Sequence, residues 1–421
     1  MTRVKDSNAE HEVVVIGGGI VGAAIAEQLQ SRGHRVFLVD RDTPGNGCSY
    51  GNAGHFATDV VFPLANMQTI LALPKMLADP LGPLSIRWQY LPKMLPWLMR
   101  FALAALPGNV RRSCDNLRAL NSRSIDSYNR LLTRLELQDL MTRKGALTIY
   151  ESQQSEKKNR ATVEQLRGFG VEIESLDRAE IRDLEPALGE NIAGGLFFPK
   201  TAHTVNPFRL VQSLVSRFCD QGGVFLQQNV TDAHTLSDGT TRVVLADGSA
   251  LRAQKVILAA GAWSRPLARQ LGFSVPLDTE RGYHLMLPEP GCTLSRPMVS
   301  FERSFVMTPM EEGVRLAGTV ELAGLEAPAD NRRADILFQH AQSILPGLQS
   351  QGAQRWMGFR PSLPDSLPVI GASPKNPNQL FAFGHQHLGL TQAAITAELL
   401  ADQLEGKRPE LDLTPFSITR F

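Results

Sequence analysis

The feature that most constrains this chain is a glycine-rich turn between an apolar run and a helical segment near the N-terminus. Glu12–Ile16 (EVVVI) is typical of a buried parallel strand, and the turn GGGIVG at 17–22 follows it directly. Ala23–Gln30 has helical spacing that Gly33 ends, and Arg35–Val39 (RVFLV) predicts a second strand. The segment therefore predicts a βαβ unit that belongs to a mixed α/β fold.

Three glycines of this turn, Gly17, Gly19 and Gly22, form a GxGxxG pattern. Gly17 allows the tight turn after the strand, Gly19 lets the backbone approach a pyrophosphate, and Gly22 lets the helix pack closely on the sheet. Ile20 and Val21 open the helix, where free N–H groups and the helix dipole favour negative charge. The pattern predicts a dinucleotide-binding site; the alternative is a close-packed turn without a ligand.

Asp40 ends the second strand, where it is placed to accept hydrogen bonds from ribose hydroxyls, and Arg41 follows it. A carboxylate there would repel the 2′-phosphate of NADP. An NAD enzyme normally continues with further βα repeats, whereas this chain enters a glycine-rich loop from Gly45 to Gly54 that suits a second stretch of cofactor. We therefore predict FAD. Cys48 is more typical of a buried small side chain than of an attachment point, so the FAD is expected to be noncovalent.

Composition and charge exclude several other classes of protein. The chain has 421 residues and a net charge of +1, which argues against a nucleic-acid partner. Its four cysteines lie far apart without a CxxC pair, so we expect free thiols and no metal site. The polar N-terminus and the lack of an apolar run of about 18 residues predict neither a secretory signal nor a transmembrane helix, which favours a cytoplasmic location.

The segment 63–107 is unusually rich in Leu, Met, Trp and Pro, and its few charges are mostly basic. Its prolines break it into short helices. One interpretation is peripheral contact with the cytoplasmic face of the inner membrane, and another is a wall of the substrate pocket. The alternative is a pair of helices packed on the domain core.

The order of the elements along the chain predicts two interleaved domains that share a cleft. We assign 10–62, 194–265 and 355–410 to a Rossmann-like FAD-binding domain. The segments 63–193 and 266–354 are assigned to a substrate domain, because 275–320 alternates as an antiparallel sheet does. Within the third FAD segment, 356–371 is expected to be a proline-rich loop.

Four motifs carry a resemblance to a known family over nearly the whole chain. VVVIGGGIVGAAIAEQLQSRGHRVFLVDR, VILAAGAWS at 256–264, GFRPSLPDSLPVIG at 358–371 and FGHQHLGLTQAA at 383–394 resemble the D-amino-acid oxidase (DAO) family of flavoproteins. CSYGNAG at 48–54 and the apolar segment after it are similar to bacterial D-amino-acid dehydrogenases. HQHLGLT departs from the dehydrogenase form and resembles members acting on cyclic imino acids such as D-hydroxyproline.

The resemblance implies further cofactor contacts. Ser49, Asn52, Ala53 and Gly54 would line the flavin, and Val230 would pair its backbone with adenine. The motif around the pyrophosphate contributes Ala260, Gly261 and Trp263. The pyrimidine end of the flavin would lie near the start of the last helix, where a helix N-terminus stabilises the negative charge of reduced flavin; the residues there are Gly384, Leu388, Gly389, Leu390 and Thr391.

Arg360 is the first candidate for binding a substrate carboxylate, because a planar guanidinium matches a carboxylate in bidentate fashion. Arg281 is a second candidate, for which a salt bridge with Glu280 or another acid is the alternative. Tyr283 would share a face with Arg281, since side chains alternate along a strand. His55 and His387 are candidates for pocket walls, or for histidines bonded to backbone in turns.

The resemblance implies oxidation of the carbon–nitrogen bond of a D-amino or cyclic D-imino acid, such as D-proline or 4-hydroxy-D-proline, by hydride transfer to flavin N5. The electrons would pass to a quinone or another acceptor. An oxygen-using oxidase of the sarcosine or glycine type is one alternative. The other is a flavin subunit of a larger electron-transfer complex, and oligomerisation is left open.

Overall fold

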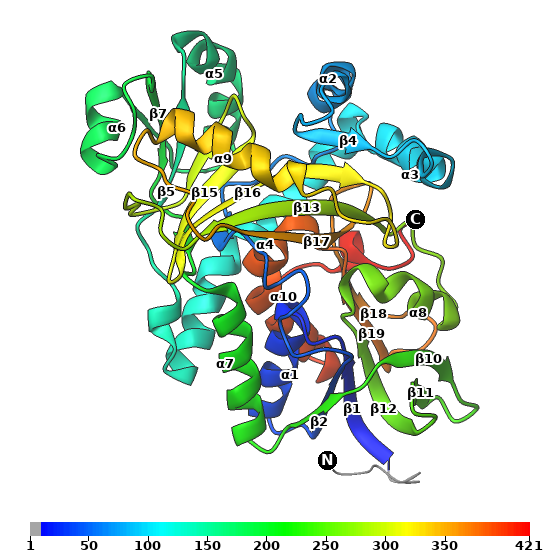
Figure 1. Ribbon diagram of the computed structural model, residues 1–421. Helices are drawn as coiled ribbons and strands as arrows, with labels where there is room; N and C mark the ends of the chain where they lie inside the picture. Colours follow the sequence, from blue (N-terminus) through cyan, green and yellow to red (C-terminus); the bar gives the residue numbers. More distant parts are fainter. Residues whose placement is uncertain (1–9) are drawn as a thin grey trace.

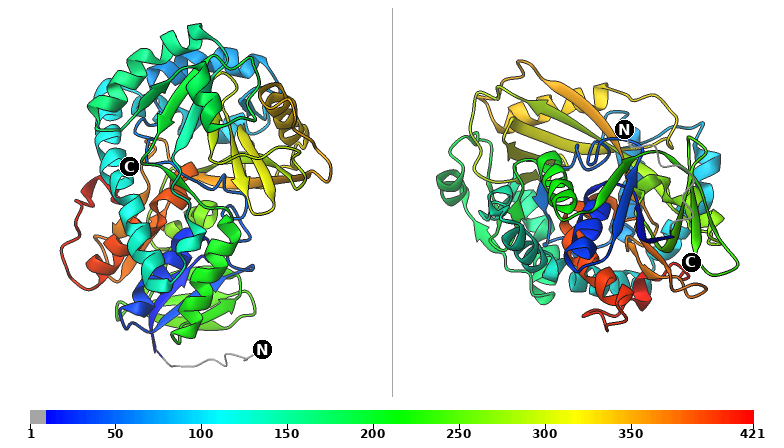
Figure 2. Two further views of the ribbon diagram at one scale, coloured as in Figure 1. Left: turned by 90° about the vertical axis from the view of Figure 1, so that its left-hand side faces the viewer. Right: turned by 90° about the horizontal axis from the view of Figure 1, so that it is seen from below.

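The structure of the protein is a computed structural model that describes residues 10–421, and two large β-sheets organise this part of the chain. The second sheet lies above the first in Figure 1. The predicted mixed α/β fold is confirmed. Each sheet forms one lobe with the helices around it, and Figure 2 shows the molecule from the side and from below.

The first sheet has eight strands among the described residues, and its centre is parallel. β18 (Val369–Ala372) pairs with β19 (Gln379–Phe383), which runs parallel to β12. The remaining order across the sheet is β10 (Val230–Thr235), β11 (Thr241–Leu245), β12 (Ala250–Leu258), β1 (Glu10–Ile16), β2 (Val36–Asp40) and β9 (Val224–Gln227).

Helices cover one face of this sheet. α1 (Ile20–Ser31) packs against α7 (Pro207–Asp220) and α10 (Gly389–Leu404), and α10 packs against the long α4 (Pro107–Leu135). Their apolar faces and one face of the sheet form a single core. A second core lies on the opposite face, which α8 (Ser264–Gln270) helps to cover. Burial on both faces explains why the parallel strands are continuously apolar.

The glycine turn between β1 and α1 has the geometry that its sequence predicts. Gly17 has φ of +114°, a conformation that side chains other than glycine rarely adopt. A Cβ added to Gly22 would lie 1.8 Å from the carbonyl oxygen of Gly17. Helix α1 therefore approaches the strand as closely as its backbone allows.

The second sheet is mostly antiparallel, and β4 (Leu84–Ile86) pairs with β16 at its margin. α9 (Arg332–Ile344) lies across it, as Figure 1 shows. Near β5 and β7 lie α5 (Gln153–Gly168) and α6 (Arg178–Leu184). The order of the other strands is β17 (Gln354–Ser362), β13 (Asp278–Leu287), β16 (Gly313–Leu322), β15 (Phe305–Met310), β14 (Met298–Ser300), β5 (Ala146–Tyr150), β7 (Gly194–Phe198) and β6 (Glu174–Leu176).

Two expectations about strands differ from the structure. The predicted proline-rich loop at 356–371 contains strands β17 and β18. β17 tolerates Pro361 because it is the edge strand of its sheet, where a missing N–H breaks no ladder. β7 and β17 both belong to the second sheet, although the predicted FAD-binding segments include 194–198 and 355–362.

The segment 63–107 folds as α2 (Met67–Ala78), β4 and α3 (Leu91–Ala104), at the upper right of Figure 1. One face of α3 is buried: Met94, Trp97 and Phe101 pack with Leu322 of the second sheet. The opposite face is exposed. Among residues 10–421, no helix combines the length and the apolarity needed to cross a bilayer.

The close approach of α1 predicts that Gly22→Ala destabilises the protein. The new methyl group would force the helix away from the strand, and overpacking of this kind costs about 2–3 kcal/mol or more. Urea denaturation followed by circular dichroism measures the effect. Gly108→Ala is the matched control, because a Cβ there meets nothing within 4 Å and lies in the exposed first turn of α4. Equal unfolding midpoints for the two variants would contradict the argument.

Candidate functional site

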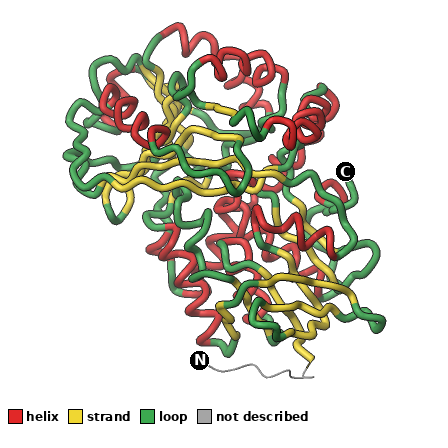
Figure 3. The backbone as a smooth tube through the Cα atoms, turned by 45° about the vertical axis from the view of Figure 1, so that its right-hand side comes forward, coloured by secondary structure: helices red, strands yellow, loops and turns green. Residues whose placement is uncertain are grey.

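A cavity of about 430 Å³ opens where several parallel strands of the first sheet end. Its lining comes from the turns after β1, β2, β12 and β19, where the chain leaves the sheet. Ligand pockets of α/β sheets form at this edge, and their volumes are about 300–1,000 Å³. The tube drawing in Figure 3 shows the strands of this lobe and the helices beside them.

Most of the predicted cofactor residues line this cavity. They come from segments that are distant in the sequence, which the first sheet brings together. They are Gly17, Gly19, Ile20, Val21, Asp40, Arg41, Ser49, Asn52, Val230, Ala260, Gly261, Trp263, Gly384, Gly389 and Leu390.

The other predicted cofactor residues lie outside the lining and support it. Gly22 packs beneath the turn at Gly17. The Thr391 hydroxyl accepts a hydrogen bond from the Ala57 N–H at 3.0 Å. This bond ties the first turn of α10 to the chain just after the glycine-rich loop at 45–54, which we call the flavin loop. Leu388 is buried in the helical core. Ala53 and Gly54 also lie outside the lining.

Sequence reasoning missed several lining residues. Gln228 and Asn229 connect β9 to β10, Thr231 lies near the start of β10, and Phe359 and Pro361 come from β17. The first three were detectable, because β9 is parallel to β2 and therefore ends at the same edge of the sheet. The two β17 residues depend on strand pairing that the sequence does not reveal. His385, Gln386 and Cys48 also line the cavity.

Asp40 and Arg41 shape one end of the cavity. One carboxylate oxygen of Asp40 accepts a hydrogen bond from the Gly18 N–H at 2.5 Å, so the acid is held against the turn. The Arg41 guanidinium lies over the Trp263 ring, 3.9 Å from its centroid. Trp263 in turn contacts Phe359 edge to face, with ring centroids 5.4 Å apart. Aromatic and cationic side chains therefore form the cavity wall next to Asp40, the acid that is expected to bind ribose hydroxyls.

The glycine-rich loop crosses the start of α1. The Ser49 hydroxyl accepts a hydrogen bond from the Ile20 N–H at 2.9 Å, at the positive end of the helix dipole. Gly51 lies against Trp356 of β17, because a Cβ on Gly51 would lie 2.0 Å from that indole. Arg315 of β16 donates to the carbonyl oxygens of Tyr50 and Asn52, at 2.9 and 2.6 Å. The second sheet therefore holds the loop in place.

Arg360 of β17 is not itself among the residues that line the cavity, but its strand neighbours Phe359 and Pro361 are, so Arg360 lies at the margin of the cavity. Its guanidinium packs on Gly282, since a Cβ there would lie 2.4 Å from the guanidinium carbon. Among residues 10–421 it makes no hydrogen bond to another side chain and no ion pair. Burial raises the pKa of Cys48, and the charge of Arg360 opposes that rise. Burial, together with the charge of Arg360, lowers the pKa of His387 to about 4. Arg360, Cys48 and His387 are therefore neighbours.

His387 is exposed, yet burial is the main cause of its low pKa. Both observations fit a side chain that borders an internal cleft enclosed by protein. His387 is consequently neutral at pH 7. His55 pairs with His203 between β3 (His55–Phe56) and β8 (Ala202–His203), and it lies outside the cavity lining. No group of three His, Cys, Asp or Glu side chains in the described chain is arranged to hold a metal.

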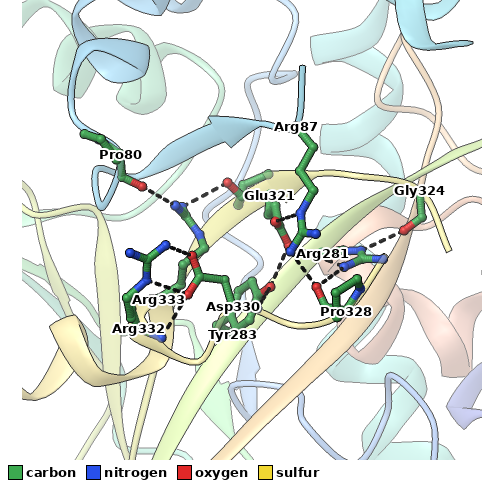
Figure 4. Close-up of polar contacts among 11 residues, drawn as sticks. Pro80, Arg87, Arg281, Tyr283, Glu321, Gly324, Pro328, Asp330, Arg332 and Arg333 are labelled. Atoms are coloured by element: carbon green, nitrogen blue, oxygen red, sulfur yellow. Dashed lines mark hydrogen bonds and ion pairs between the residues drawn. The ribbon is translucent and has the colours of Figure 1, made fainter. Parts of the chain in front are cut away.

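Arg281 and Tyr283 share a face of β13, as the alternation of side chains predicts, but that face is closed. Both side chains reach the carboxylate of Glu321, with Tyr283 Oη at 2.6 Å and Arg281 Nη1 at 3.5 Å (Figure 4). Arg281 Nε also donates to the Gly324 carbonyl at 2.7 Å. Arg281 is 0% exposed and Tyr283 is 1% exposed. The salt bridge weighed for Arg281 is therefore present, with Glu321 as its acid, and neither residue lines the cavity.

The same network anchors the apolar segment to the second sheet. Arg87, next to β4, donates to Glu321 at 2.7 Å. Arg333 of α9 donates to the carbonyl oxygens of Pro80 and Gly82, both at 2.9 Å, as Figure 4 shows for Pro80. Glu321 is 3% exposed, so its buried charge needs these donors.

The residues present fit an FAD molecule. The turn at Gly17 and Gly22 leaves no room for side chains, the start of α1 supplies N–H donors, and Asp40 faces the cavity. A family model described as FAD-dependent oxidoreductase (DAO) matches residues 12–403. The chain belongs to this family. The predicted FAD cofactor is thereby confirmed.

Known relatives cover almost the whole chain. A D-amino-acid oxidase of Bradyrhizobium diazoefficiens is 34% identical over 416 residues, which are 97% of this chain and 98% of the relative. A D-amino acid dehydrogenase of Rhizobium rhizogenes is 28% identical over 97% of this chain and 100% of its own length. These matches confirm that the protein is an FAD-dependent oxidoreductase enzyme.

Solved structures confirm the fold. A glycine oxidase from Geobacillus kaustophilus has a TM-score of 0.72 and 23% identity, with 98% of this chain and 99% of that chain covered. An L-proline dehydrogenase from P. horikoshii has a TM-score of 0.71 and 17% identity, with 98% of each chain covered. At such identities the similarity concerns the fold alone.

The position of Asp40 predicts that Asp40→Ala weakens FAD binding by about 10- to 100-fold, because hydrogen bonds to a charged acceptor contribute about 1.5–3 kcal/mol. Fluorescence titration of the apoprotein with FAD measures the dissociation constant. Asp247→Ala, in an exposed turn, is the control and should bind FAD as the unaltered protein does. An unchanged dissociation constant for Asp40→Ala would remove Asp40 from the cofactor site.

Proposed function

We propose that this protein oxidises the carbon–nitrogen bond of a D-amino acid or a cyclic D-imino acid. The observation that carries the proposal is the unpaired guanidinium of Arg360 beside the cofactor cavity. FAD, held by the glycine turn, Asp40 and the flavin loop, would supply the two-electron chemistry. The relatives named D-amino-acid oxidase and D-amino acid dehydrogenase support the substrate class.

Arg360 would bind and orient the substrate carboxylate. A guanidinium without a protein partner, resting on the bare backbone of Gly282, is free to form two parallel hydrogen bonds to a carboxylate. Holding the carboxylate there would fix the position of the neighbouring Cα relative to the cofactor. Neutral His387 would border this site without competing for the carboxylate.

The cyclic-imino-acid preference is supported by the HQHLGLT segment. It forms the short helix at Gln386–Leu388 and the start of α10, and Gln386, Gly389 and Leu390 line the cavity. A wall made by these close-packed groups suits a compact ring better than a long side chain. D-Proline and 4-hydroxy-D-proline are therefore the substrates to test first.

We expect Arg360→Gln to lower kcat/KM for such substrates by about 100-fold or more, because truncating a charged partner of a carboxylate costs 2–5 kcal/mol. Flavin bleaching under anaerobic conditions, with rising substrate concentrations, measures the loss. Arg355→Gln is the matched control, because Arg355 is exposed on the same strand and pairs with Asp335 at the surface. Arg360→Gln with unaltered kinetics would exclude Arg360 as the carboxylate ligand.

The electron acceptor is proposed to be a quinone or another acceptor reached at a membrane surface. The exposed face of α3 carries apolar side chains at helical spacing, and α2 carries two further exposed apolar residues. Exposed Lys75, Lys93 and Arg100 accompany them, and Asp79 is the sole acidic residue in 63–107. An apolar face with a basic rim is typical of binding to anionic lipids. The exposed apolar residues are Met67, Leu71, Trp88, Leu95, Met99, Leu103 and Leu106.

Membrane contact predicts co-sedimentation of the holoenzyme with vesicles that contain anionic lipid, and release by Leu95→Glu/Met99→Glu. Charges on the apolar face would oppose insertion and repel the lipid headgroups. Val224→Glu is the control, because Val224 is an exposed apolar residue of the first sheet. Equal vesicle binding by both variants would contradict the membrane proposal. Hydrogen peroxide formed in proportion to substrate would identify dioxygen as the acceptor, as the oxidase alternative requires.

A further inference from the structure

Glu280 is a buried carboxyl group beside Arg360 that the proposed carboxylate site does not use. It lies on β13 directly opposite Arg360 on β17, so the two side chains project from the same face of the sheet. Glu280 is 6% exposed. It belongs to the ERGYH segment, in which the sequence drew attention to Arg281 and Tyr283 instead.

A hydrogen-bond chain connects Glu280 to the cofactor cavity. The Ser362 hydroxyl donates to one oxygen of Glu280 at 2.5 Å. The Gln386 side-chain amide donates to that hydroxyl at 3.1 Å and to the Leu363 carbonyl at 3.0 Å. Ser362 is 0% exposed, and Gln386 lines the cavity. The carboxyl group is therefore held in one orientation at the edge of the site.

Gln386 adopts backbone geometry that is costly for a residue with a side chain. Its φ of +50° lies in the left-handed region, as does the φ of +63° at neighbouring Ser366. Backbone strain of this kind persists where the surrounding structure imposes it, and it occurs often at functional sites. In this backbone conformation the Gln386 amide reaches the Ser362 hydroxyl.

Glu280 and Arg360 each keep polar atoms that no other side chain of the described chain binds, and their charges are opposite. Within residues 10–421 the second carboxylate oxygen of Glu280 has no hydrogen-bond partner, and no ion pair within 4.0 Å joins the two residues. A buried carboxylate and a guanidinium that are neighbours without pairing match the two charges of an α-amino acid. The guanidinium suits the carboxylate of the substrate, and the carboxylate suits its ammonium group.

The surroundings of Glu280 raise its affinity for a proton. Burial raises its pKa, and the charge of Asp278 adds to this, whereas the Ser362 hydrogen bond and Arg360 oppose it. Asp278 is itself held by the Tyr90 hydroxyl at 2.9 Å. A raised pKa brings the carboxyl group closer to the pKa of an ammonium ion, which favours proton transfer from that ion.

We propose that Glu280 binds the substrate nitrogen and accepts the proton of the substrate ammonium, with Ser362 and Gln386 fixing the carboxylate. This inference rests on the proposed function. One N–H bond of the ammonium breaks and one O–H bond forms on Glu280. The nitrogen lone pair that is released forms the C=N bond as hydride leaves Cα for the flavin, so the substrate loses two electrons and the flavin gains them.

The decisive experiment compares the pH dependence of flavin reduction in the unaltered holoenzyme and in Glu280→Gln, with D-proline under anaerobic conditions. Without the proton acceptor, only substrate that has already lost its proton in solution reacts. At pH 7 the second-order rate constant of Glu280→Gln should be at least about 100-fold lower. It should rise about tenfold per pH unit and approach the unaltered rate above the pKa of the substrate amine.

Three controls separate proton transfer from a loss of folding. Glu280→Asp keeps the carboxyl group and should recover part of the rate with a nearly flat pH profile. Glu312→Gln, at an exposed residue in the turn between β15 and β16, should leave the rate unchanged. A carboxylate without nitrogen, such as propanoate, should perturb the flavin spectrum of Glu280→Gln at the same concentrations as in the unaltered enzyme, because Arg360 remains.

The outcomes are distinguishable. If D-amino and D-imino acids bleach the flavin equally fast in the unaltered enzyme and in Glu280→Gln, with the same pH profile, the role of Glu280 is overturned. The proposed function then remains intact. A flavin that none of these substrates bleaches in the unaltered enzyme overturns the proposed function and the nitrogen subsite together. A steep pH profile confined to Glu280→Gln supports the proposal.

Discussion

The close approach of helix α1 to the first sheet is the constraint on which the rest of the site depends. Only glycine at 17 and 22 permits it, since the carbonyl oxygen of Gly17 occupies the space that a Cβ on Gly22 would need. The approach sets the start of α1 at the edge of the sheet. There Asp40 accepts a hydrogen bond from the Gly18 N–H, and Ser49 accepts one from the Ile20 N–H. The cofactor cavity follows from this one packing distance.

The second sheet contributes the proposed substrate-binding side of the site through its edge. β13 and β17 place Arg360 and Glu280 beside the cavity, while β16 holds the flavin loop through Arg315. The opposite face of β13 is closed by the charges that converge on Glu321. Side-chain alternation along one strand therefore separates a structural ion network from the groups that remain free for a substrate.

The sequence predicted local elements better than it predicted pairing. The first βαβ unit, the final helix and the cavity residues at their ends were recognisable, because glycines and apolar runs act within a few residues. β17 was taken for a loop because Pro361, with further prolines after the strand, hid an edge strand. Arg281 and Tyr283 were correctly placed on one face, but which face is closed depends on Glu321, in another strand. The Glu280–Ser362–Gln386 contacts likewise depend on long-range register, which sequence spacing does not encode.

The order of strands in the first sheet also has a consequence during synthesis. α1 packs against α10, and β12 pairs with β19, so these two surfaces stay uncovered until the last part of the chain leaves the ribosome, although α7 and the neighbouring strands are available earlier. At about 5–20 residues per second, the apolar face of α1 would wait roughly 20 to 70 seconds for α10. A nascent chain with such an exposed face is a natural client for chaperones, and truncation before β19 would leave the protein prone to aggregation.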